Sequence, residues 1–183
     1  MLPVLVTCGE PSGIGPEVIV KARAILGADL PLVWMGDPRH LPQGTRWREV
    51  LSPAEAVDVP AAQLPVLRHD FKAPAPPGQP DPRNAQCVID VIARGATLTR
   101  QGKAGALCTL PIHKKALKDG AGFPHPGHTE FLAHLAGDVP VVMMLASEQL
   151  RVVPATIHVA LAEVPHLLTA DLLEQVIRVT HAG

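Results

Sequence analysis

The sequence contains no tyrosine, and only 3% of its residues are aromatic. A core built on large rings is therefore excluded, although 47% of the 183 residues are hydrophobic. We expect the core to consist of Val, Leu, Ile and Ala, which suits a parallel sheet covered by helices. The length predicts one domain or slightly more.

The chain also lacks an excess of charge, with a net charge of -1 and no Lys/Arg cluster on any predicted helix face. This balance argues against nucleic acid or an anionic membrane as a partner and favours a small molecule. No apolar run has the length of a membrane-spanning helix. The N-terminus lacks a signal-peptide pattern, so we predict a cytoplasmic protein.

Cysteine is scarce, and no Cys-x-x-Cys spacing occurs. Cys8, Cys87 and Cys108 are odd in number and far apart in the sequence. We predict buried, reduced thiols rather than disulfides or a metal site.

Apolar runs alternate with amphipathic segments through the first two thirds of the chain. Helices are predicted from Pro16, over Asn84–Arg100 and over Lys114–Asp119. Strands are predicted at Leu2–Cys8, Leu30–Met35, Leu64–Arg68 and Gly105–Leu110. Residues 36–63 are weakly patterned, and the proline-rich segment 72–83 is expected to be an exposed loop. The order predicts an α/β fold with a doubly wound, largely parallel sheet.

The last third of the chain is predicted to begin with a helix near Thr129. Two strands, Val139–Leu145 and Leu150–Val159, follow with a tight connection, and a final helix covers 169–180 with Thr169 as its N-cap. A doubly wound sheet normally continues with another strand after such a helix. We therefore expect an α/β/α sheet that is incomplete at the C-terminus.

The loop Gly9–Gly15 joins a buried strand to a helix. Glycines at such a turn let the backbone approach an anion at the helix N-terminus. The loop matches neither the dinucleotide-binding nor the Walker A pattern. It is either an anion-facing turn or a tight turn without a ligand.

The segment Thr109–Lys115 follows a predicted strand at its carboxyl end, where ligand loops gather. Lys114 or Lys115 is a candidate phosphate contact. The alternative is an exposed lysine pair on a short helix.

The segment Pro126–Glu130 is the most informative feature of the sequence. Pro-Gly makes a turn, and His128 and Thr129 then lie at the start of a helix with unpaired N–H groups. An imidazole, a hydroxyl and a helix N-terminus together can bind an oxyanion such as phosphate. Without further context, a structural role for the pair is equally open. The nearby His125 and His134 are predicted to be solvated or structural.

His158 is expected near the carboxyl end of the second predicted strand, on the same face as Thr156. A lone strand histidine is usually structural. A metal ion needs about three protein ligands, and no neighbouring residue in the sequence completes such a set.

Five segments, taken in order, resemble the 4-hydroxythreonine-4-phosphate dehydrogenase family of pyridoxine biosynthesis. They are Gly9–Glu17, Thr109–Leu117, Pro126–Ala133, Met143–Val153 and Thr156–Leu161. The resemblance implies an isocitrate/isopropylmalate dehydrogenase-like fold and a homodimer with an active site between domains. It implies NAD(P)-dependent oxidation and decarboxylation of 4-phosphooxy-L-threonine to 3-amino-2-oxopropyl phosphate, within pyridoxal phosphate biosynthesis.

The resemblance also assigns individual residues. His128 and Thr129 match substrate contacts of the family, and Lys114 matches a lysine in a loop near the substrate. His158 matches one of three histidines that bind a divalent metal, which is zinc, magnesium or cobalt and can polarise the reacting oxygen.

Members of the family are nearly twice as long as this chain. The resemblance therefore implies that residues 1–183 form the N-terminal portion of a two-domain dehydrogenase, without the cofactor-binding half and two of the metal histidines. We expect this chain alone to be inactive, with a separately encoded second half as one explanation. Two other functions stay open: a dehydrogenase of another four-carbon phosphorylated hydroxy acid, and a non-catalytic phosphate-binding or assembly module.

Overall fold

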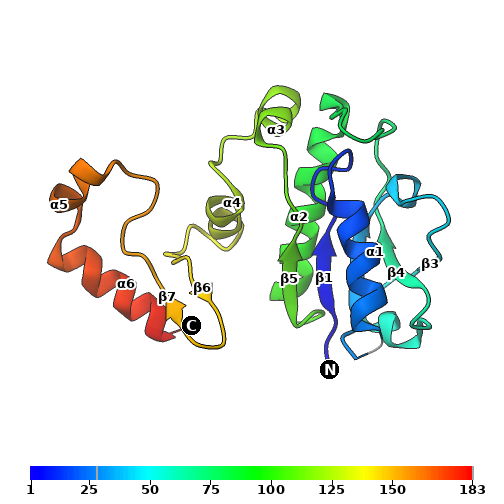
Figure 1. Cartoon of the computed structure of the whole chain (residues 1–183), viewed down its shortest axis with the longest axis horizontal. Coiled ribbons are helices and arrows are strands. Elements are labelled where there is room, and N and C mark those ends of the chain that lie inside the picture. Colours follow the sequence, from blue (N-terminus) through cyan, green and yellow to red (C-terminus); the bar gives the residue numbers. More distant parts are fainter. Residues whose placement is uncertain (28, 183) are drawn as a thin grey trace. The chain divides into compact units, whose positions relative to one another are not determined.

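The computed structural model describes residues 1–27 and 29–182. The chain divides into two compact units, Met1–His128 and Thr129–Gly183 (Figure 1). The first unit contains the central sheet, and the second contains short helices and a small hairpin.

The first unit is built on a five-stranded sheet with the order β3-β4-β2-β1-β5. Its strands are β1 (Val4–Thr7), β2 (Leu32–Gly36), β3 (Trp47–Glu49), β4 (Leu64–Arg68) and β5 (Ala106–Thr109). Every neighbouring pair is parallel, and Val4 is in register with Leu32 on one side and Ala106 on the other. The predicted parallel α/β sheet is confirmed.

Two helices lie on opposite faces of this sheet. Helix α1 (Gly15–Leu26) connects β1 to β2, and α2 (Ala85–Arg100) connects β4 to β5. Figure 1 shows α1 in front of the sheet and α2 behind it. Because crossover connections are right-handed, helices that lead toward opposite edges cover opposite faces. The strand order therefore reverses between β1 and β5, which makes the carboxyl ends of these two strands the switch point of the sheet.

The core lies between the sheet and its helices. Leu5, Val33 and Val66 on the strands and Val91 on α2 are completely buried. Trp34 is also completely buried, so the expectation of a purely aliphatic core is wrong at this position. The cysteines are free; Cys8 and Cys87 are buried as predicted, whereas Cys108 is exposed because β5 is an edge strand.

The weakly patterned region after β2 contains strand β3 and two short 3-10 helices, Pro38–His40 and Pro53–Asp58. Strand β3 has only three residues, and all of them are exposed. It therefore carries no alternation of buried and exposed positions that the sequence could reveal. A third 3-10 helix, Pro82–Asn84, ends the proline-rich loop and leads into α2.

The two long strands predicted in the second unit are wrong. Helix α4 (His128–Leu135) is followed by an antiparallel pair of two-residue strands, β6 (Leu145–Ala146) and β7 (Arg151–Val152). Proline at 140 and at 154 removes ladder donors on both sides of this hairpin. A short hairpin without further strands has little stability of its own, so the rest of the predicted strands is irregular.

The predicted final helix is confirmed as α6 (Ala170–Ala182). It follows a short 3-10 helix, Leu161–Glu163, and helix α5 (Val164–Leu167). The Thr169 hydroxyl accepts a hydrogen bond from the Leu172 N–H at 3.1 Å, as an N-cap should. Within the described ranges, none of the helices is long and apolar enough to cross a membrane.

A substitution at Gly9 tests how tightly the switch point is packed. Gly9 has a φ of +66°, and a Cβ there would lie 2.5 Å from the Pro111 carbonyl oxygen. We expect Gly9→Ala to lower the free energy of unfolding by about 2–3 kcal/mol, measured by urea denaturation, because backbone strain and a clash add together. Gly122→Ala is the matched control: its φ is +63°, but no atom of the described residues lies within 4 Å of the added Cβ. Equal losses in the two variants would contradict close packing at Gly9.

Candidate functional site

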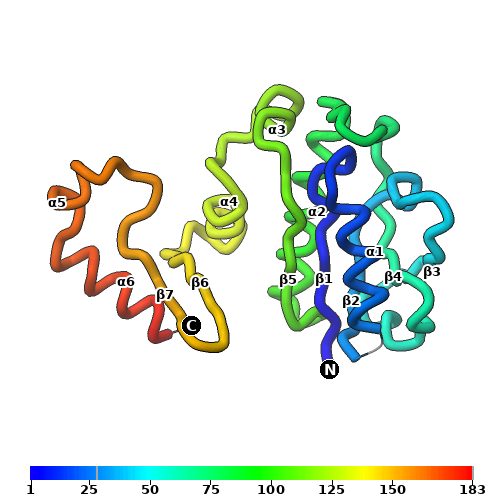
Figure 2. The backbone as a smooth tube through the Cα atoms, in the orientation of Figure 1, coloured from blue at the N-terminus to red at the C-terminus, as the bar shows by residue number. Residues whose placement is uncertain are grey.

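The loops that follow β1 and β5 meet at the switch point of the sheet. The Glu10 N–H donates to the Pro111 carbonyl oxygen at 2.8 Å. In Figure 2 the blue segment after β1 and the green segment after β5 leave the sheet at the same end. Ligands of open parallel sheets bind at such a place.

In the loop Gly9–Gly15, backbone N–H groups donate hydrogen bonds to another residue of the same loop. Ser12 N–H donates to the Glu10 carboxylate at 3.0 Å, and Gly13 N–H donates to the Glu10 carbonyl at 2.9 Å. Glu10 is only 8% exposed, so a carboxylate occupies the inside of the turn. Its negative charge disfavours an anion there. The structure therefore favours the interpretation of a tight turn without a ligand.

The two lysines that follow β5, Lys114 and Lys115, differ in the partners of their side chains. Lys115 forms an ion pair with Asp119 one turn further along α3 (Lys114–Ala121). For Lys114, no ion pair or hydrogen bond of the side chain is found within residues 1–27 and 29–182. Lys114 is therefore the better candidate for contacting a phosphate.

His113 caps the start of α3, a role that the sequence analysis missed. Its Nδ1 accepts a hydrogen bond from the Ala116 N–H at 3.1 Å. Since Nδ1 is an acceptor, the neutral ring carries its proton on Nε2 and presents a hydrogen-bond donor beside Lys114. The sequence signal for this N-cap was a histidine directly before the predicted helix, three residues ahead of the N–H that it binds.

His128 lies close to Lys114 in the first unit. The ring is half-buried, and burial together with the positive charge of Lys114 lowers the pKa of His128 below 6.5. Its Nε2 is buried and has no hydrogen-bond partner among the described residues. A buried ring nitrogen of this kind calls for a partner from outside the chain, such as a ligand or water. The structure thus brings together two of the residues that the sequence singled out.

Thr129 follows His128 in α4 and is exposed. The first N–H groups of a helix have no partner within the helix and point toward its N-terminal end. The hydroxyl of Thr129 and these N–H groups are therefore available at the beginning of α4. A hydroxyl and unpaired N–H groups at a helix N-terminus are donors suited to a phosphate.

Two neighbouring histidines have structural partners. The ring of His125 packs edge-on against Phe123, with centroids 5.3 Å apart, and His134 Nδ1 lies 2.9 Å from Asp138 Oδ1. Both findings agree with the solvated or structural roles expected from the sequence.

His158 is not on a strand, so that prediction is wrong. It lies at an exposed bend with a φ of +58°, which a residue with a side chain rarely adopts. In the described part of the chain, no group of three or more His, Cys, Asp or Glu side chains could hold a metal ion. These residues by themselves do not fit a divalent metal centre.

A buried carboxylate outside the phosphate site was also missed. Asp37 follows β2, is completely buried, and accepts hydrogen bonds from the Arg39 guanidinium at 2.6 Å and from the Phe71 N–H at 3.0 Å. Burial would raise the pKa of Asp37, but these bonds and the charge of His40 lower it to about 2. The sequence signal was an Asp-Pro-Arg motif that occurs again at 81–83.

The parallel sheet and its switch point define an α/β protein of the doubly wound type, in which ligands bind at the carboxyl ends of the strands. The match to known proteins is more specific. The chain belongs to the family described as pyridoxal phosphate biosynthetic protein PdxA, whose family model matches residues 18–183.

Relatives with high identity carry one name. The chain is 61% identical to the 4-hydroxythreonine-4-phosphate dehydrogenase of Paracoccus denitrificans over 99% of this chain and 56% of the relative. It is 59% identical to the enzyme of the same name from Roseobacter denitrificans, again over 99% of this chain and 56% of the relative. The chain thus spans little more than half the length of these curated relatives.

Solved structures agree with the family. The 4-hydroxythreonine-4-phosphate dehydrogenase of Klebsiella pneumoniae matches with a TM-score of 0.87 and 31% identity, over 97% of this chain and 57% of that chain. A terephthalate 1,2-cis-dihydrodiol dehydrogenase from Burkholderia xenovorans matches with a TM-score of 0.66 and 26% identity, over 97% of this chain and 55% of that chain. The same fold therefore serves dehydrogenases that are named for different substrates.

Proposed function

We propose that this chain is part of an NAD(P)-dependent dehydrogenase that oxidises 4-hydroxythreonine 4-phosphate in pyridoxal phosphate biosynthesis. In this reaction the oxidised substrate loses carbon dioxide and gives 3-amino-2-oxopropyl phosphate. Family membership and the 61% identity to a relative with this name support the proposal. The single structural observation that carries it is the unpartnered Nε2 of His128 beside the charge of Lys114.

The role of this chain in that reaction is to hold the phosphate of the substrate. His128 and Lys114 provide positive charge or donors, and Thr129 provides a hydroxyl at the start of α4. Fixing the phosphate positions the remainder of the substrate for oxidation elsewhere. We further propose an isocitrate/isopropylmalate dehydrogenase-like fold in which residues 1–183 are the N-terminal portion and the rest supplies most of the cofactor surface.

NAD(P), as the hydride acceptor, follows from the name of the relatives rather than from a site in this chain. His158 is proposed as one ligand of a divalent metal that is zinc, magnesium or cobalt. Its exposure at a bend leaves the ring open to a metal whose other ligands come from elsewhere.

A dehydrogenase of another four-carbon phosphorylated hydroxy acid is the second candidate. The match to a terephthalate dihydrodiol dehydrogenase shows that this fold also occurs in a protein named for a different substrate, so the fold alone leaves the substrate open. His128, Lys114 and Thr129 would bind the phosphate end of either substrate, so they do not discriminate between the two.

The decisive experiment separates binding from chemistry. Calorimetric titration of the 183-residue chain with 4-hydroxythreonine 4-phosphate should show binding, and with dephosphorylated 4-hydroxythreonine it should not. NADH formation by the chain alone should be undetectable with or without added zinc, magnesium or cobalt. Metal-dependent NADH formation would contradict inactivity of this portion. Equal binding of the two compounds would contradict a phosphate site, and tighter binding of another phosphorylated hydroxy acid would select the second candidate.

The pKa of His128 provides a prediction on pH. Its pKa is lowered in the free protein, so the ring is neutral at pH 7. A bound phosphate stabilises the charged imidazolium and raises this pKa, so binding should take up a proton near and below neutral pH. Titration of the ring protons of His128 by NMR, with and without the substrate, measures the shift. His134, which lies on the same helix and pairs with Asp138, is the control: addition of the substrate at a fixed pH should leave its ring signals unchanged.

We propose a homodimer as the assembled form. Support comes from the apolar surface of the second unit, where Leu173 and Ile177 of α6 are exposed and line a groove of about 540 Å³. Exposed aliphatic side chains that gather on one helix are typical of an interaction surface. Light scattering should show a dimer, and Ile177→Glu should shift it toward monomer. A monomer at every concentration would contradict the proposal.

A further inference from the structure

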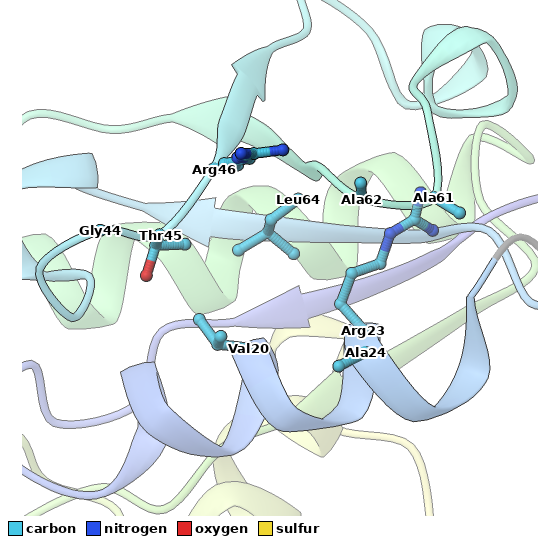
Figure 3. A pocket seen from close by; sticks show the side chains of 9 residues that line it. All are labelled: Val20, Arg23, Ala24, Gly44, Thr45, Arg46, Ala61, Ala62 and Leu64. Carbon is cyan, nitrogen blue, oxygen red and sulfur yellow. The ribbon is translucent and has the colours of Figure 1, made fainter.

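A pocket of about 280 Å³ lies in the first unit, between α1 and the outer strands β3 and β4. Figure 3 shows Val20, Arg23 and Ala24 on α1 along one side of this pocket, with Arg46 on the opposite side. Its other lining residues are Gly44, Thr45, Ala61, Ala62 and Leu64. None of these is a candidate phosphate residue of the switch point, so the pocket is a separate feature.

The lining contains two guanidinium groups and no carboxylate. Arg23 is only 4% exposed, and its charge meets backbone carbonyls: Gln63 O at 3.0 Å, Gly27 O at 2.7 Å, and Val59 O and Pro60 O at 3.2 Å. Burial lowers the pKa of Arg23, but arginine stays charged near neutral pH. Carbonyl groups satisfy its hydrogen bonds without cancelling the positive charge.

Asp29 lines a neighbouring pocket together with Arg23, but it forms no ion pair with Arg23 in the part of the chain that the structure describes. A buried cation without an anionic partner is costly, and an anion placed nearby lowers that cost. Arg46 is exposed, and its side chain has no ion pair within the described ranges, so its guanidinium is available to a ligand.

We propose that this pocket binds a small organic anion, with one carboxylate or phosphate group held by Arg46 and attracted by Arg23. The apolar body of the ligand lies against Val20 and Ala24, which line the same pocket. The volume accepts a ligand of a few carbon atoms. Planar guanidinium groups bind carboxylate and phosphate with paired hydrogen bonds, so the two headgroups share one recognition chemistry.

NMR titration of the 183-residue chain with butyrate, butyl phosphate and inorganic phosphate tests the proposal. Butyrate or butyl phosphate should shift the amide signals of Gly44, Thr45, Ala61 and Ala62, and the tighter of the two identifies the headgroup. Inorganic phosphate should bind more weakly because it has no apolar body. Absence of shifts at these amides with all three probes, or equal affinity for inorganic phosphate, would overturn the proposal.

Three variants assign the binding to this pocket. Arg46→Gln should weaken binding about tenfold, because a charge-assisted pair of hydrogen bonds is lost. Ala24→Leu should block the pocket while both arginines remain. Arg48→Gln is the matched control: Arg48 is exposed two residues further along and donates to the Asp58 carbonyl, outside the pocket. Equal weakening by Arg46→Gln and Arg48→Gln would show only general attraction by positive charge.

Discussion

Asp37→Asn should lower the free energy of unfolding by about 2 kcal/mol, because a completely buried carboxylate loses a charge-assisted hydrogen bond from the Arg39 side chain. The substitution keeps the shape of the side chain but removes the charge that the Arg39 guanidinium faces at 2.6 Å. It also replaces an acceptor of the Phe71 N–H, which ties the segment after β4 to the end of β2. Urea denaturation at pH 7 measures the loss.

The chain contains its own control for this substitution. Asp81 holds Arg83 in an almost identical arrangement, with Arg83 Nη2 at 2.6 Å and the Arg83 N–H at 2.9 Å. The Asp81 side chain is 23% exposed, whereas that of Asp37 is completely buried. Asp81→Asn should therefore change stability little, because exposed ion pairs are weak. Similar losses in the two variants would show that the motif itself, and not burial, determines the effect.

The pH dependence of the free energy of unfolding tests the role of the Asp37 charge without any change to the side chain. The pKa of Asp37 is about 2 in the folded protein against 3.8 in the unfolded chain. Its contribution is fully present above pH 3.8 and is lost as the pH falls toward 2. The stability of the natural protein should therefore fall more steeply in this window than that of Asp37→Asn.

The sequence predicted the first unit well because its strands and helices obtain their neighbours from within that unit. The runs at β1, β2 and β4 are apolar because each strand is buried between two others or under a helix. The same reasoning failed at 139–159. An apolar run predicts a strand only if partner strands are present to bury its side chains. Here only two residue pairs form a ladder between β6 and β7.

The candidate site shows a similar division. The Pro-Gly turn and the position of His128 could be recognised because both depend on local backbone geometry. The choice between Lys114 and Lys115 could not, since it depends on the ion pair that Lys115 forms with Asp119, whereas Lys114 has no ion pair in the described chain. Likewise, the position of the Glu10 carboxylate inside the first loop could not be predicted from the spacing of residues, because it depends on the folded conformation of the loop.

His128→Ala should weaken binding of 4-hydroxythreonine 4-phosphate to this chain by about 10- to 100-fold, since a charge-assisted hydrogen bond to phosphate is worth about 1.5–3 kcal/mol. Calorimetric titration slightly below neutral pH is the measurement, because a bound phosphate favours the protonated ring. His128→Gln keeps a neutral donor and should retain part of the affinity while removing the contribution of the imidazole to the pH dependence of binding.

His134→Ala is the matched control, because His134 lies on the same helix but pairs with Asp138 at the surface. It should leave the affinity unchanged. Urea denaturation of the variants separates binding from folding: the Nε2 of His128 has no partner in the described chain, so His128→Ala removes no hydrogen bond from that atom. If His128→Ala bound the substrate as tightly as His134→Ala, the imidazole of His128 would not be a phosphate contact, and Lys114 would be left as the candidate in the first unit.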